Sequence, residues 1–295
     1  MNERQLERIA CETYKILFGV SASFVQTELT FYGCVVFLAS ERQKVVIKFS
    51  KEVGRLTKEI NGLERLAKIV DCPVPAIHFY GQQEGFDYLV LEWLDGQSAH
   101  ELPLDKTATT TFSEHYTDIL LALHECSHEQ GFETSPQCFT PSLNEAFEHW
   151  MEPVYRYLMS AASPFSAQLK DDYQALWEQQ TDILAPINHG SSLVHDDCHI
   201  GNVLFDPKTY RVSALIDPCD VGFKHREFDI FHLYDVRPDL GLADVYFSKT
   251  EKADGFEQRR WFLSLWDDAK HSRNIGWYDE AWLNHKFDNY RQECA

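Results

Sequence analysis

The sequence predicts an α+β protein with a small antiparallel β-sheet lobe and a larger, mainly helical lobe. Three observations lead to this class. Residues 24–49 hold three runs of β-branched and aromatic residues separated by short polar turns. Beyond residue 95, apolar residues recur mainly at helical spacing. Three short strand-like runs interrupt this helical part at 193–216 and surround a polar loop. A chain of 295 residues can bury a core large enough for two lobes.

Composition narrows the range of partners. The formal net charge is −19, which argues against nucleic acid and against anionic membrane surfaces. The 44% of apolar residues is ordinary for a globular protein. The eight cysteines show no C-x-x-C and no zinc spacing, and no apolar run resembles a signal peptide or a membrane span. We therefore expect a reduced, cytoplasmic location, no nucleic-acid partner and no membrane partner.

The first lobe begins with an amphipathic helix over residues 3–18. Strands are expected over the runs FVQTEL, GCVVFLA and KVVIKF, with a hairpin turn at 40–43. Leu56 to Val70 then shows helical spacing, and Glu59 on this helix follows Lys48 by eleven residues. A fixed carboxylate would restrict the positions of the flexible lysine.

The pattern changes after residue 94. Residues 76–80 and 88–92 predict two further strands, and the turn signal Asp95-Gly96 marks the expected lobe boundary. The expected domains are therefore 1–94, a β-rich lobe, and 95–295, a mainly helical lobe. Helices in the second lobe are expected around these apolar stripes: Tyr116 to Leu123, Phe147 to Leu158, Leu169 to Trp177, Phe262 to Trp266 and Trp282 to Phe287.

The polar residues with the clearest chemistry collect in one loop and at the end of one strand. The loop runs from His195 to Asn202 between two apolar runs, and Asp217 ends the strand that follows. Asp197 is a candidate base, while Asn202 and Asp217 offer hard oxygen ligands. Mg²⁺ suits this set, because it is held by one or two side chains, substrate phosphates and water. Phosphoryl transfer needs such a metal, positioning, and an acceptor for the hydroxyl proton.

The segment HDDCHIGNVLF…ALIDP resembles the aminoglycoside phosphotransferase/choline kinase-like family, whose loop and metal-binding Asp it matches. The continuation DPCDVGFKHREFDI is most similar to the fructosamine (ketosamine) kinase branch. The resemblance implies a protein-kinase-like, two-lobed fold and an enzyme that uses ATP and Mg²⁺. It makes 1–94 the nucleotide-binding lobe and 95–295 the catalytic and substrate lobe. It implies transfer of the γ-phosphate to a hydroxyl of a small-molecule acceptor, a sugar-amine such as a fructosamine.

The same resemblance assigns roles to single residues. Asp197 is the catalytic residue, and Asn202 and Asp217 hold the metal. Lys48 binds the nucleotide phosphates and pairs with Glu59, for which Glu52 and Glu64 compete. Backbone groups of Glu92, Trp93 and Leu94 hydrogen-bond the adenine. The supporting residues are His195, His199, His225, Glu227 and Asp229; Glu227 or Asp229 is expected to anchor the loop through hydrogen bonds.

Two departures from the family pattern keep alternatives open. Asp196 stands where a small glycine is usual, so an extra negative charge lies beside the proposed base. The loop at 30–34, which would cover the phosphates, offers only Gly33. An aminoglycoside, choline or another hydroxylated amine is an alternative acceptor. A nucleotide-binding, kinase-like protein with little catalytic activity is the alternative from a different class.

Overall fold

The computed structural model describes residues 2–187 and 190–294 and shows an α+β protein. The chain divides into two compact units. The N-terminal unit contains Met1–Phe112 and Gly201–Val221, and the C-terminal unit contains Ser113–Ile200 and Gly222–Ala295. The predicted fold class, with a small antiparallel sheet and a larger helical part, is confirmed. The lobe boundary expected after residue 94 stays a prediction.

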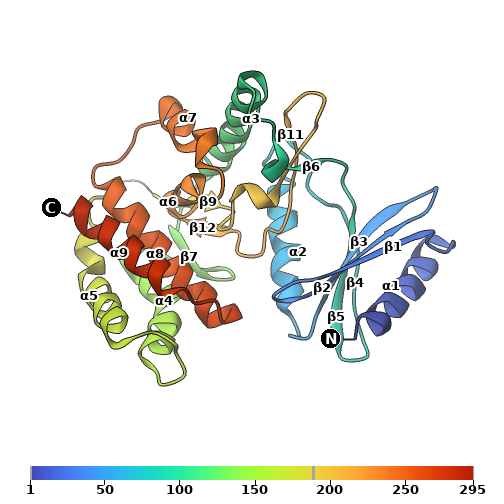
Figure 1. Ribbon diagram of the computed structural model, residues 1–295, viewed down its shortest axis with the longest axis horizontal. Coiled ribbons are helices and arrows are strands. Elements are labelled where there is room, and N and C mark those ends of the chain that lie inside the picture. Colours follow the sequence, from blue (N-terminus) through green and yellow to red (C-terminus); the bar gives the residue numbers. More distant parts are fainter. Residues whose placement is uncertain (1, 188–189, 295) are drawn as a thin grey trace. The chain divides into compact units, whose positions relative to one another are not determined.

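A five-stranded antiparallel sheet forms the centre of the N-terminal unit, in the order β1-β2-β3-β5-β4. Its strands are β1 (Phe24–Leu29), β2 (Gly33–Ala39), β3 (Lys44–Ser50), β4 (Ile77–Gln83) and β5 (Phe86–Glu92). Helix α1 (Glu3–Phe18) lies along this sheet (Figure 1). Leu6, Ile9 and Tyr14 on one face of α1 are fully buried against strand residues, as the helical spacing predicts.

The strands β4 and β5 are longer than predicted. The expected seven-residue turn is reduced to Glu84 and Gly85, both with positive φ (53° and 81°). Such a two-residue turn follows the twist of the flanking strands, so pairing continues up to Gln83 and Phe86.

Helix α2 (Arg55–Leu66) packs through Leu56 and Leu63 on Leu89 and Leu91 of β5. A second sheet of this unit has the order β11-β10-β6. Its strands are β6 (Gln97–Ser98), β10 (Val203–Phe205) and β11 (Val212–Leu215).

Helices dominate the C-terminal unit (Figure 1). They are α3 (Lys106–His124, within this unit from Ser113 onward), α4 (Leu143–Met159), α5 (Ala167–Leu184), α6 (Glu227–Ile230), α7 (Leu242–Lys249), α8 (Phe256–Ile275) and α9 (Glu280–Glu293). Helices α4, α5, α8 and α9 lie side by side and share one apolar core around Trp266, which is fully buried. Most aromatic residues of the predicted stripes thus pack inside this unit, whereas Trp282 on α9 is 43% exposed.

Three short strands of this unit escaped the prediction. They are β7 (Phe132–Ser135), β8 (Cys138–Thr140) and β12 (Gly222–Lys224). β7 pairs with β8, and β12 pairs with β9 (Ser192–Val194). The apolar run before the polar loop, β9, therefore lies in a different sheet from β10 and β11, which follow the loop. Strands of three or four residues are too short to show a period, so their pairing depends on segments distant in sequence.

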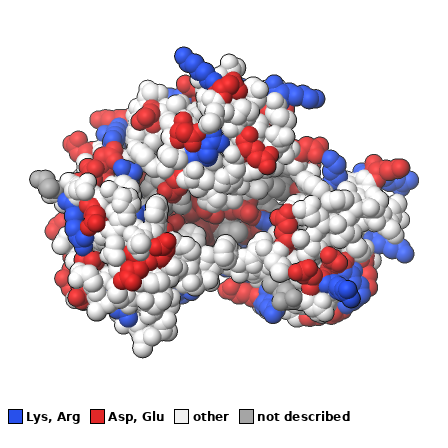
Figure 2. All heavy atoms as spheres, viewed as in Figure 1, with Lys and Arg blue, Asp and Glu red and all other residues white. Residues whose placement is uncertain are grey.

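The surface carries charges of both signs. On the face shown in Figure 2, acidic side chains are spread widely, with lysines and arginines among them. Within the described residues, no helix combines the length and apolar character needed to cross a bilayer.

Candidate functional site

The N-terminal unit contains a partly buried ion pair at the predicted position. Lys48 lies on β3, and its Nζ is 2.6 Å from Oε1 of Glu59 on α2. The side chain of Glu59 is 2% exposed, so this carboxylate is held in place by the helix and its packing. Of the three glutamates considered as partners of Lys48, the structure thus places Glu59 on this lysine. Lys48 Nζ also contacts the carboxylate of Asp217.

Asn202 and Asp217 lie at the same end of the β10–β11 hairpin. Val203 pairs with Leu215, and the backbone N–H of Ile216 donates to the carbonyl oxygen of Asn202 at 3.0 Å. The chain turns sharply at Asp217, which has φ of 59°. Two oxygen donors at one hairpin end fit Mg²⁺, which needs few protein ligands. Among residues 2–187 and 190–294, no group of three or more His, Cys, Asp or Glu forms a metal cage.

Gly62 brings α2 directly onto the turn that carries Asp217. A Cβ atom at this position would lie 1.9 Å from the carbonyl oxygen of Pro218. Glycine therefore allows the helix backbone to approach the turn closely. Sequence reasoning missed this residue, although a glycine in the middle of an amphipathic helix was a visible signal.

The segment after β5 is partly used by the fold itself. The backbone N–H groups of Glu92 and Trp93 donate to the carbonyls of Ala76 and Lys44, at 2.8 and 3.3 Å. The Trp93 ring packs on Phe37, with ring centroids 5.2 Å apart. Two of the three backbone donors expected to face adenine are therefore engaged within this unit.

The turn between β1 and β2 is a tight hairpin rather than a glycine-rich loop. The Thr30 N–H donates to the Gly33 carbonyl at 3.0 Å, and the Thr30 hydroxyl accepts from the Gly33 N–H at 3.1 Å. A Cβ on Gly33 would lie 1.8 Å from the carbonyl oxygen of Phe49. Gly33 thus serves the close approach of β2 to β3.

In the C-terminal unit, one buried carboxylate clamps the start of the polar loop. Asp229 is fully buried and accepts hydrogen bonds from the backbone N–H groups of His195 and Asp196, at 2.9 and 2.7 Å. His124 Nε2 lies 3.0 Å from the same carboxylate. Burial by itself raises the pKa of Asp229, but the hydrogen bond and charge of His124, with His195, outweigh it and lower this pKa. The carboxylate is therefore a fixed anchor for the loop.

Three more supporting residues, His195, His225 and Glu227, are also buried, whereas the side chain of His199 is 33% exposed. Both oxygens of Glu227 contact the Arg259 guanidinium, at 2.7 and 2.8 Å, in a pair that is almost fully buried. His225 and His195 are each 1% exposed. The His225 Nδ1 accepts from the Glu227 N–H at 3.3 Å. This geometry anchors the segment that follows β12.

Asp197 differs from these residues because it is partly open to solvent. Its side chain is 38% exposed, and its Oδ1 lies 3.4 Å from Nε2 of His199. The carbonyl of the next residue, Cys198, accepts a hydrogen bond from the buried hydroxyl of Tyr116. The loop backbone is thus tied down on both sides of Asp197, while its carboxylate stays accessible.

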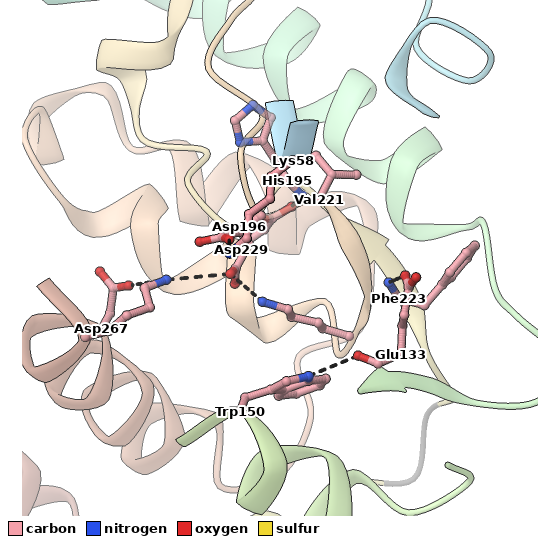
Figure 3. A network of polar contacts seen from close by, with 12 residues as sticks. Lys58, Glu133, Trp150, His195, Asp196, Val221, Phe223, Asp229 and Asp267 are labelled. Carbon is pink, nitrogen blue, oxygen red and sulfur yellow. Dashed lines mark hydrogen bonds and ion pairs between the residues drawn. The ribbon is translucent and has the colours of Figure 1, made fainter. Parts of the chain in front are cut away.

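Asp196 has lysine partners that sequence reasoning missed. Its side chain is 5% exposed and contacts Nζ of Lys224, and Nζ of Lys270 lies 3.6 Å away. Figure 3 shows this carboxylate with Asp267 on one side and Trp150 on the other. The extra charge beside Asp197 is therefore balanced within the same unit.

The chain has a kinase-like fold. Solved structures that share it include the following three, at identities that speak for the fold alone. The crystal structure of aminoglycoside phosphotransferase APH(4)-Ia has a TM-score of 0.78 at 15% identity, covering 99% of each chain. A Haemophilus somnus 129PT protein, whose assignment as a fructosamine-3-kinase is itself provisional, has a TM-score of 0.75 at 17% identity, also over 99% of each chain. A kanamycin- and GDP-bound aminoglycoside phosphotransferase has a TM-score of 0.68 at 13% identity, over 98% of each.

The particular family follows from the sequence match. The model of the phosphotransferase enzyme family matches residues 35–262, and the chain belongs to this family. The family inferred from the loop motif is thereby confirmed. The uncharacterized protein YcbJ of Escherichia coli K12 is 27% identical over 89 residues. That match spans 30% of either chain.

Proposed function

We propose that this protein is an ATP- and Mg²⁺-dependent kinase that phosphorylates a hydroxyl of a sugar-amine such as a fructosamine. One observation carries the proposal: Glu59, Lys48 and Asp217 form a continuous series of contacts in the N-terminal unit, and Asn202 joins Asp217 at one hairpin end. A lysine held by a buried carboxylate, beside two oxygen ligands, suits a metal–nucleotide complex.

The related structures support the use of a nucleotide. Complexes of APH(4)-Ia contain ADP or AMP-PNP together with hygromycin B, and the 2″-phosphotransferase complexes contain GDP. In our proposal Lys48 donates to the α- and β-phosphates and Glu59 keeps its ammonium group in position. The N–H of Leu94 and the carbonyl of Glu92 are the backbone groups that we assign to adenine. Asn202 and Asp217 would hold the magnesium ion, which neutralises phosphate charge when bound.

Asp197 is the residue that we assign to the acceptor hydroxyl. An alcohol is a poor nucleophile, and its proton must leave as the phosphoryl group is transferred. A partly exposed carboxylate on a clamped loop can accept the hydrogen bond of that hydroxyl and take its proton. Its separation from Asn202 by five residues keeps base and metal ligand on one loop.

The acceptor class rests on the segment after Asp217, which resembles the fructosamine kinase branch. Aminoglycosides, choline and other hydroxylated amines are the alternatives. A nucleotide-binding protein with little catalysis was suggested by Asp196, but the contact with Lys224 balances that charge. ATP turnover with a panel of ketosamines, aminoglycosides and choline separates these functions. Nucleotide binding without turnover on any acceptor would contradict the kinase proposal.

Asp217→Ala tests the metal assignment. We expect the variant to fold, because this side chain is 42% exposed at a hairpin end. Stabilisation by ATP should then lose its dependence on Mg²⁺, measured as the shift of the melting temperature over a magnesium titration. Asp206→Ala, at the opposite end of the hairpin, is the matched control and should keep the wild-type response. Unchanged magnesium dependence in Asp217→Ala would exclude this ligand.

A further inference from the structure

We propose that Lys224 and Lys270 are positioning residues for the catalytic loop, acting through the carboxylate of Asp196. The inference rests on the proposed role of Asp197 and adds residues that no loop motif contains. All the groups involved belong to the C-terminal unit.

The backbone at Asp196 has an unusual conformation. Its φ is 62°, in the left-handed region that glycine adopts freely and that other residues adopt at a cost. Its N–H donates to Asp229 Oδ1 at 2.7 Å, directly after the His195 N–H has donated to Oδ2 of the same carboxylate. This turn determines the direction in which the chain leaves for Asp197.

The side chain of Asp196 is held from two separate elements. Lys224 comes from β12, which pairs with β9 just before the loop, and Lys270 comes from α8. Lys270 is also 2.9 Å from Asp267, so its ammonium group lies between the buried carboxylate of Asp196 and the carboxylate of Asp267. A buried carboxylate is stable only with nearby cations, and removal of one partner leaves an uncompensated charge.

Lys224 is itself restricted. Its side chain is 15% exposed, and its Nζ lies 5.2 Å from the ring centroid of Trp150 and 5.7 Å from that of Phe228. The faces of aromatic rings attract an ammonium group. Trp150 is held in turn, because its indole N–H donates to the carbonyl of Glu133 at 3.0 Å (Figure 3). The ammonium group is thus confined to the position that contacts Asp196.

The ion pair of Asp196 with the two lysines therefore fixes the loop. A glycine at position 196 would adopt the same turn without an ion pair. With aspartate present, the left-handed turn requires both the Asp229 clamp and the two lysines. If Lys224 is replaced, the carboxylate of Asp196 must move toward water. This movement displaces the backbone of Asp196, which is bonded directly to Asp197. A displacement of about 1 Å at a catalytic group can cost on the order of 100-fold in rate.

A double-mutant cycle tests this, with Lys224→Met, Asp196→Gly and the double variant. Turnover is measured with ATP, Mg²⁺ and 1-deoxy-1-morpholinofructose as the ketosamine probe. We expect Lys224→Met to lower kcat by about 10- to 100-fold with less than about threefold change in the KM for ATP. The double variant should recover kcat to within about fivefold of wild type, because glycine adopts the turn and brings no charge. Lys270→Met should show a smaller loss, given its longer distance.

Hydrogen exchange of the peptide covering residues 193–202 supplies a readout that needs no turnover. Exchange there should be faster in Lys224→Met and return toward wild type in the double variant. Lys249→Met is the matched control: this lysine is 19% exposed and pairs with Glu114 and Asp118 on α3. It should leave kcat and loop exchange unchanged.

The outcomes separate the two proposals. If no acceptor is phosphorylated but hydrogen exchange of residues 193–202 changes as expected, the kinase function is rejected and the positioning role of Lys224 stands. The positioning role is overturned if the double variant has the same kcat as Lys224→Met and its loop exchanges hydrogen just as fast. A Lys224→Met protein that fails to fold supports it only if the double variant folds; an unfolded double variant contradicts it.

Discussion

Two adjacent carboxylates in one loop have opposite surroundings. Asp196 is buried and contacts a lysine, whereas Asp197 is partly exposed beside a histidine. The backbone at Asp196 is left-handed, and the two side chains contact different partners. A paired, buried carboxylate serves structure, and an accessible one can meet a substrate. The environments, rather than the residue type, thus separate the roles that we propose.

Asp197→Asn tests this separation. The amide keeps the shape of the side chain and removes its capacity to take a proton. We expect kcat to fall by about 10²–10⁴-fold, with nucleotide binding largely retained. Steady-state kinetics and ATP titration by calorimetry measure the two quantities. Asp196→Asn should cost less, and the reverse order of severity would move the assigned base to Asp196.

At the scale of single elements, α2 connects two parts of the proposed nucleotide site. Glu59 faces Lys48 from this helix, and Gly62, about one turn later, touches the turn of Asp217 and Pro218. The helix therefore holds the lysine through a carboxylate and the metal ligand through a close backbone contact. Both contacts lie within the N-terminal unit.

Gly62→Ala should push α2 away from the Pro218 carbonyl. Alanine usually stabilises a helix interior, but here its Cβ would meet backbone at 1.9 Å. We expect a loss of about 1–3 kcal/mol in the free energy of unfolding and weaker ATP·Mg²⁺ binding. Urea titration and calorimetry measure these. Asn61→Ala, exposed on the same helix, is the control. A Gly62→Ala protein as stable as this control would rule out the tight contact.

The elements themselves were largely predictable. The helix over 3–18, the first three strands and the helical stripes of the second lobe follow from period and turn residues, and all are present. The hairpin β7–β8 and the strand β12 were missed because runs of three or four residues carry no period. The Lys48–Glu59 pair was predicted through family resemblance, whereas Gly62 required the distance to Pro218.

At the scale of the whole molecule, buried charges couple stability to pH. His232 is buried near Asp235, at 3.4 Å, and near Asp267. Burial disfavours the charged imidazole, but the hydrogen bond to Asp235 and the charge of Asp267 outweigh it and raise the pKa of His232 to about 9. Because this pKa exceeds the unfolded value of about 6.5, the protonated form stabilises the fold.

His232→Gln should therefore change the alkaline limb of the stability curve. The contribution of His232 is fully present below about pH 6.5 and is lost as pH rises through about 9. We expect the wild type to lose about 1–3 kcal/mol more than the variant between pH 6 and pH 9. Urea midpoints across this range measure the difference, with the exposed His285→Gln as control. Parallel curves for wild type and His232→Gln would refute the raised pKa.

Some features of this protein depend on residues close together in the sequence, and others depend on contacts between distant residues. Hydrophobic period, turn residues and the loop motif are local, so the sequence alone was enough for the α+β class, most elements and the family. The partners of Asp196 are not local. Asp196 meets a lysine 28 residues later on β12 and a second lysine on α8, and β9 pairs with β12 instead of the strands that follow the loop. Such pairings depend on where the chain returns after folding, and only the tertiary structure could show that the charge at Asp196 is balanced.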